Sequence, residues 1–148
     1  MKKRLNFVSN SSSSSFIVIK KGKKDKIKKH SKKKLIVPCI YGDSAFGWDE
    51  HTYYDFYTKL NFCVYQCLYV WNGQGEEWFE MLKEVIQNKL KLELELEKSE
   101  NVYDYDGYID HQSSSYEGRN TEMFNNKEDL ETFLFSSSSY LQTGNDNE

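Results

Sequence analysis

The sequence predicts an α+β fold with a mainly antiparallel sheet of about five short strands and two to three helices. Runs rich in β-branched and aromatic residues stand near both ends of the 148-residue chain, and helical apolar patterns lie between them. The length suits one domain, and 38% apolar with 16% aromatic residues supply enough side-chain area for a core. We therefore expect a single domain over residues 1–148.

Three short strands are expected in the first part of the chain. Residues 5–10 (LNFVSN) and 16–20 (FIVIK) flank the serines of Ser11–Ser15, which either form the hairpin between two strands or act as a processing or recognition tag. Leu35–Tyr41 (LIVPCIY) is the third strand, and its proline favours a sheet edge or a strand end. Between them, the lysine-rich residues 20–34 are expected to form a loop or linker.

Two helices follow. Over Trp48–Asn72 apolar residues recur at steps of three and four, and acidic residues stand near the start, where the helix dipole favours them. The β-branched and aromatic content of residues 62–71 also fits a buried strand, but we expect a helix. The Asn72–Gly75 break precedes a second amphipathic helix over 76–90.

The remaining elements are shorter. Residues Leu90–Lys98 alternate leucine with charged residues, which predicts a half-buried strand. A turn-rich stretch follows over 103–118, and Asn126 is placed to cap a helix over 127–135 together with Asp129. Residues 139–144 (SYLQTG) complete the sheet as a last short strand.

Cysteine usage and hydropathy narrow the class of protein. The three cysteines, Cys39, Cys63 and Cys67, have no metal-site spacing, so we expect reduced thiols that pack as small apolar groups. We see neither a signal peptide nor the roughly 20-residue apolar run of a membrane helix. The chain is therefore expected in the cytoplasm, with no membrane partner, no metal and no cofactor.

Charge divides the chain into two parts. Residues 1–34 hold 13 Lys or Arg against one acid, whereas the rest holds 7 against 22 acids. The basic part is expected to be a solvated loop, or a loop that folds back on the acidic part. A further alternative is a phosphate-binding arm, although the run has no aromatic residue to stack on bases. Its residues would be Lys23, Lys24, Lys28, Lys29, Lys32, Lys33 and Lys34.

The acidic part predicts a protein-binding surface. An acidic strand face can occupy a site that evolved for nucleic acid, because carboxylates along a strand face approach the spacing of phosphates. The residues that would form it are Glu93, Glu95, Glu97, Asp104, Asp106 and Asp110.

An alternative site lies in the turn-rich stretch and consists of Asp110, His111, Ser113 and Glu117. Carboxylates and imidazole there would suit a small metal- or nucleotide-dependent enzyme. The spacing fits neither an EF-hand nor a G-x-S-x-G nucleophile motif, so a hydrogen-bonded surface loop is the better interpretation. The serine clusters Ser11–Ser15, Ser113–Ser115 and Ser136–Ser139 are expected to form turns rather than phosphate nests.

The opening FVSNSSSSSFIV resembles the N-terminus of a group of small uncharacterised proteins from bacteria, phages and prophages. The segments IDHQSSS (Ile109–Ser115) and SYLQTGNDN (Ser139–Asn147) resemble parts of the same group. The resemblance implies a phage or mobile-element accessory protein made in a bacterial host cell, and it carries no activity. We therefore expect stoichiometric binding to a host protein, such as inhibition of a host-defence nuclease in the manner of an anti-CRISPR, rather than catalysis.

Overall fold

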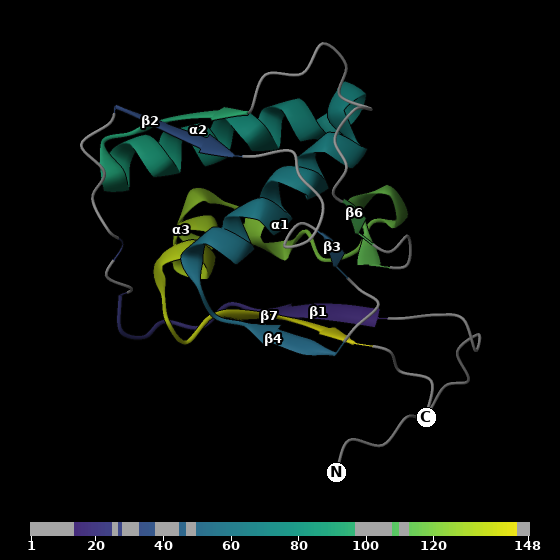
Figure 1. Ribbon diagram of the computed structural model, residues 1–148. Coiled ribbons are helices and arrows are strands. Elements are labelled where there is room, and N and C mark those ends of the chain that lie inside the picture. The colour runs from purple at the N-terminus through teal and green to yellow at the C-terminus, as the bar shows by residue number, and fades with distance from the viewer. Residues whose placement is uncertain are drawn as a thin grey trace.

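A computed structural model describes residues 14–24, 27, 33–37, 45–46, 50–96, 108–109 and 113–144. The fold is α+β, as predicted (Figure 1). A three-stranded sheet lies at one end of the molecule, helices fill the middle, and a separate pair of strands lies against a helix at the other end. Three predictions fall on residues outside the described ranges: the strand over residues 5–10, the hairpin or tag formed by Ser11–Ser13, and the position of Pro38 at a sheet edge or strand end.

The three-stranded sheet joins the two ends of the described chain. Strand β1 (Ser14–Val18) and strand β4 (His51–Tyr53) both pair antiparallel with the central strand β7 (Tyr140–Gly144). Strand β1 begins two residues before the predicted start, so it includes the last two serines of the N-terminal tract. Leu141 and Thr143 point into the core, which fixes the register of all three strands.

The other strands pair in parallel. Strand β2 (Lys34–Val37) lies beside β5 (Glu93–Leu96), and β3 (Ala45–Phe46) lies beside β6 (Tyr108–Ile109). Parallel neighbours need a long crossover, and here two helices separate β2 from β5 in the sequence. The antiparallel character that the sequence predicted therefore belongs to the three-stranded sheet alone.

Helix α1 (Phe56–Tyr69) begins later than predicted. The expected start at Trp48 is wrong because His51–Tyr53 pair with β7, and because Asp55 caps the helix through hydrogen bonds from the backbone N–H (2.9 Å) and the hydroxyl (2.8 Å) of Thr58. The helical interpretation of residues 62–69 is confirmed. Their high apolar content reflects position, since α1 lies beside α3 in the middle of the molecule, between the three-stranded sheet and α2, and is buried on most of its circumference.

Helices α2 (Glu76–Leu90) and α3 (Lys127–Phe135) have the predicted bounds. A tight turn over Trp71–Gly75 joins α1 to α2. Lys91, with φ of 57°, ends α2, so Leu90 is the last helical residue and not the start of the strand as predicted. Asn126 caps α3 as expected, because its Oδ1 accepts the N–H of Asp129 at 2.8 Å.

The core centres on α1. The same buried cluster includes side chains from the other elements: Leu82 and Ile86 of α2, Leu130, Phe133 and Leu134 of α3, and Leu141 of β7. Cys63 and Cys67 are free, buried thiols, and desolvation raises the pKa of both. Their predicted role as small apolar packing groups is confirmed; Cys39 lies outside the described residues. None of the helices in the described part of the chain is long and apolar enough to cross a membrane.

Candidate protein-binding surface

The parallel pair β2–β5 has one buried and one solvent-facing side. Leu35 and Val37 of β2 face the core together with Leu92 and Leu94 at β5, as the alternation in the sequence predicts. The opposite side carries the exposed residues Lys34, Ile36, Glu93 and Glu95, which we call the β2–β5 outer face. Two of the six acids predicted for protein binding thus share one surface; Glu97, Asp104, Asp106 and Asp110 lie outside the described residues.

The β2–β5 outer face is of mixed charge rather than uniformly acidic. Lys34 Nζ lies 3.0 Å from Glu95 Oε2, so a residue of the basic segment neutralises one of the predicted acids. The hydrogen bond and charge of Glu95, followed by the charge of Glu93, raise the pKa of Lys34. A row of unpaired carboxylates, as a phosphate mimic would need, is not found among the described residues of this face.

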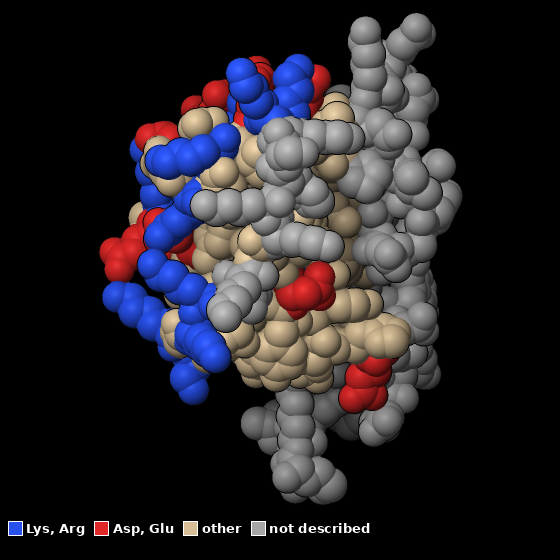
Figure 2. Space-filling model, turned by 60° about the vertical axis from the view of Figure 1, so that its left-hand side comes forward, with Lys and Arg blue, Asp and Glu red and all other residues tan. Residues whose placement is uncertain are grey.

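Opposite charges also meet elsewhere on the described surface. Lys21 of the basic segment lies 3.2 Å from Glu128, and Lys89 lies 2.6 Å from Glu131. Figure 2 shows blue and red side chains interspersed along one edge of the molecule. Among the described residues, Lys21 and Lys34 thus contact acids of the later part of the chain, as the alternative in which the basic segment folds back predicts.

Ile36 is the apolar feature of the β2–β5 outer face. Its side chain is 55% exposed. A shallow hollow of about 330 Å³ opens next to the strand pair and is lined by Glu80, Lys83, Glu84, Gln87, Glu93 and Leu94. Ile36 does not line this hollow; its neighbours on the β2–β5 outer face are Lys34, Glu93 and Glu95.

The serines of the alternative site are buried, so the expectation of a surface loop is wrong for Ser113–Ser115. The cause is Gln66 of α1, which is itself fully buried. Its Nε2 donates to the carbonyls of Ser113 (3.1 Å) and Arg119 (3.1 Å), and its Oε1 accepts the N–H of Ser115 (2.6 Å). This side-chain amide replaces the secondary-structure partners that the loop backbone lacks.

The alternative enzyme site is not assembled by the described residues. Ser113 is fully buried while Glu117 is exposed, and Asp110 and His111 lie outside the described residues. Among the residues that the structure describes, no group of three or more His, Cys, Asp or Glu side chains is placed to hold a metal ion.

The last serine cluster, Ser136–Ser139, ties the basic segment to the core. Its hydroxyls donate to backbone carbonyls of Lys20 and Lys23, and the N–H of Ser137 donates to the carbonyl of Lys23 at 2.8 Å. On the inner side, Nζ of the buried Lys59 donates to the carbonyls of Ser136 (3.0 Å) and Ser139 (3.1 Å). The prediction that these serines form hydrogen-bonded turns is confirmed.

Lys23, Lys24, Lys33 and Lys34 of the predicted nucleic-acid arm are exposed, whereas Lys28, Lys29 and Lys32 lie outside the described residues. Sequence reasoning missed Lys59 and Gln66. The available signal was a polar residue placed among the apolar positions of a helix, Lys59 next to Leu60 and Gln66 next to Cys67. Comparison of the chain with family models, with curated proteins and with solved structures finds no match.

Proposed function

We propose that the protein acts by stoichiometric binding to another protein through the β2–β5 outer face. The observation that supports the proposal is Ile36, which is 55% exposed between charged neighbours on a parallel strand pair. Apolar anchors surrounded by polar residues supply most of the affinity in protein interfaces, because the surrounding residues exclude water from the anchor. Ile36 lies on β2, which pairs with β5 along its whole length, and β5 in turn packs on α2; an anchor ordered before binding loses less entropy on binding.

The charges around Ile36 favour a protein partner over mimicry of nucleic acid. Lys34 and Glu95 form a pair; in the register Glu95 lies opposite Ile36, and Glu93 lies opposite Lys34. Such a rim is complementary to a protein surface with its own mixed charges, and it sets orientation and specificity more than affinity. The partner that we propose is therefore a protein with an apolar pocket and a basic group opposite Glu93.

The resemblance of the N-terminus to phage and prophage proteins supports a partner from a bacterial host. Inhibition of a host-defence complex would then follow from occupying a surface that the complex needs, with no reaction catalysed by this chain. The same resemblance supports a cytoplasmic site of action.

The proposal is tested by affinity capture from bacterial lysate with quantitative mass spectrometry. We expect the wild type to retain a defined partner at equimolar amount, Ile36→Val to retain it, and Ile36→Asp to lose it by roughly tenfold or more. Glu93→Lys should weaken capture, whereas Glu122→Lys makes the same charge change on an exposed residue of another element. Equal capture by the wild type and Ile36→Asp would refute the proposed surface.

A further inference from the structure

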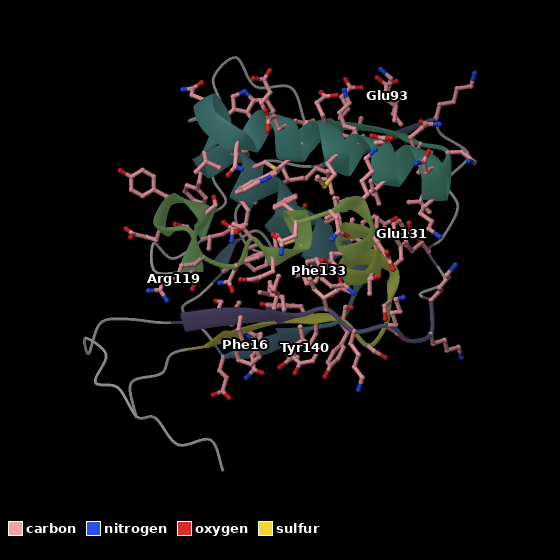
Figure 3. All side chains as sticks on the ribbon, turned by 180° about the vertical axis from the view of Figure 1, so that it is seen from behind. Phe16, Glu93, Arg119, Glu131, Phe133 and Tyr140 are labelled. Carbon is pink, nitrogen blue, oxygen red and sulfur yellow. The ribbon has the colours of Figure 1, made fainter. Side chains whose placement is uncertain are left out.

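The side of the three-stranded sheet that faces away from the helices carries aromatic residues. Residues paired across antiparallel strands share a face, so Phe16 lies on the same side as Gln142, and Val18 on the same side as Tyr140. These positions alternate with the buried Leu141 and Thr143. Figure 3 shows Phe16 and Tyr140 on the side of the sheet opposite the helices.

Tyr54 completes a group of adjacent rings on this side. Its ring centroid lies 5.1 Å from that of Tyr140 at an interplanar angle of 47°, and the centroids of Phe16 and Tyr140 are 6.4 Å apart. Tyr54 is 50% exposed, and the other two are half-buried. We call Phe16, Tyr54 and Tyr140 the sheet aromatic patch; its residues come from β1, from β7 and from the position directly after β4.

Exposed lysines begin where this patch ends. The chain leaves β1 after Val18 and continues through Lys20, Lys21, Lys23 and Lys24, all exposed. The backbone of Lys20 is held beside β7, because its N–H donates to Ser139 Oγ at 2.9 Å and its carbonyl accepts from the same hydroxyl. Ser139 directly precedes Tyr140, so the lysines start next to the aromatic rings.

An acidic residue lies at the opposite end of the sheet. Exposed Glu50 lies close to Gly144, at the far end of β7 from Lys20. Lys21 is paired with Glu128, Lys20 is the lysine held beside β7, and Lys23 and Lys24 follow it in the chain, Lys24 bordering a hollow that Glu128 and Glu131 also line. Among the described residues, lysines thus follow one end of the sheet and an acid lies at the other, so a bound polyanion would have a preferred direction.

We propose that the sheet aromatic patch and these lysines bind single-stranded nucleic acid without sequence preference. Bases stack on Tyr54 and Tyr140, and Lys20, Lys23 and Lys24 contact the phosphates. Stacking on aromatic side chains of a sheet combined with a basic track is the chemistry that such binding needs. The lysine-rich segment contains no aromatic residue, and the fold supplies the rings from β4, β7 and their flanks.

This site is independent of the protein-binding surface proposed above. The sheet aromatic patch and the β2–β5 outer face belong to separate sheets at opposite ends of the molecule (Figure 1). A variant of one surface should leave the other unchanged, so failure of either proposal can be recognised separately.

The test is fluorescence anisotropy of a labelled oligo-dT strand titrated with the full chain. Three phosphate contacts predict a slope of about −2 for log K against log salt concentration between about 50 and 200 mM. Tyr54→Ala and Tyr140→Ala should each weaken binding by roughly tenfold without changing the slope. Lys23→Gln and Lys24→Gln should each reduce the magnitude of the slope by about 0.7.

Matched controls separate a lost contact from a lost fold. Tyr140→Phe keeps the ring and should bind within about twofold of the wild type. Tyr116→Ala and Lys91→Gln remove an exposed ring and an exposed lysine elsewhere and should have no effect, and neither should Ile36→Asp. The proposal is overturned if oligo-dT does not bind at the lowest salt, if both tyrosine-to-alanine variants bind as the wild type does, or if duplex DNA binds as tightly. Loss of a protein partner in Tyr54→Ala, with no DNA binding by the wild type, would also overturn it.

Discussion

Replacing the buried Lys59 with methionine should lower the free energy of unfolding by about 2–4 kcal/mol. The methionine keeps most of the apolar stem, so the packing of α1 changes little. What disappears are two hydrogen bonds, from Nζ to the carbonyls of Ser136 and Ser139, and the approach of Nζ to the Phe133 ring at 5.8 Å.

The size of the effect follows from the two carbonyls. The carbonyl of Ser136 keeps a second donor, the N–H of Ser139 at 3.1 Å. Losing its hydrogen bond from Lys59 should therefore cost stability at the low end of the range of about 0.5–1.5 kcal/mol for one hydrogen bond. Ser139 O loses its Lys59 donor inside the protein, which costs about 1–3 kcal/mol. Methionine also removes the cost of burying an amino group, and this keeps the total below the sum of the upper limits.

Urea unfolding followed by circular dichroism measures the change, and the midpoint should fall by about 1–2 M. Lys91→Met is the matched control, since exposed Lys91 also donates to a backbone carbonyl, that of Asn88 at 3.1 Å. That control should stay within about 0.5 kcal/mol of the wild type. If Lys59→Met is as stable as Lys91→Met, the buried lysine does not hold the Ser136–Ser139 turn, and the reasoning is refuted.

Three further predictions concern single contacts. Gln66→Leu should destabilise the protein by about 3 kcal/mol in the same urea assay, because several loop backbone groups lose their partner; an unchanged midpoint would contradict this. Gly75→Ala should lower the melting temperature by several degrees, since an added Cβ would overlap a backbone carbonyl of α1, whereas Gly73→Ala adds a Cβ in open space and should change it less. Glu95→Gln should lower the pKa of Lys34, measured by NMR titration. The stability that the pair contributes is present below about pH 10.5 and is lost as the pH rises through the raised pKa of Lys34. An unchanged pKa of Lys34 in the variant would contradict this.

Local signals in the sequence were sufficient for several elements. The bounds of α2 followed from acids at its start, apolar residues at helical spacing and the Asn72–Gly75 break before it. The cap of α3 followed from Asn126 with Asp129. The buried and exposed sides of β5 followed from strict alternation of leucine with charged residues.

Features that depend on contacts distant in sequence were not predictable. A helical pattern of aromatic residues also covers β4, and only its pairing with β7 makes that segment a strand. The pairing of Lys34 with Glu95 depends on the parallel register of β2 and β5, so charge counted along the chain does not predict which charges meet. Burial of Lys59 and Gln66 depends on loops that return to α1 about 50 to 80 residues later.

Hydrogen exchange of the captured complex tests the proposed binding surface most directly. Contact at the β2–β5 outer face should slow exchange of the amides of Lys34–Val37 and Glu93–Leu96 relative to the free protein, while the amides of α3 remain unchanged. Slower exchange confined to other segments, with β2 and β5 as in the free protein, would contradict the account.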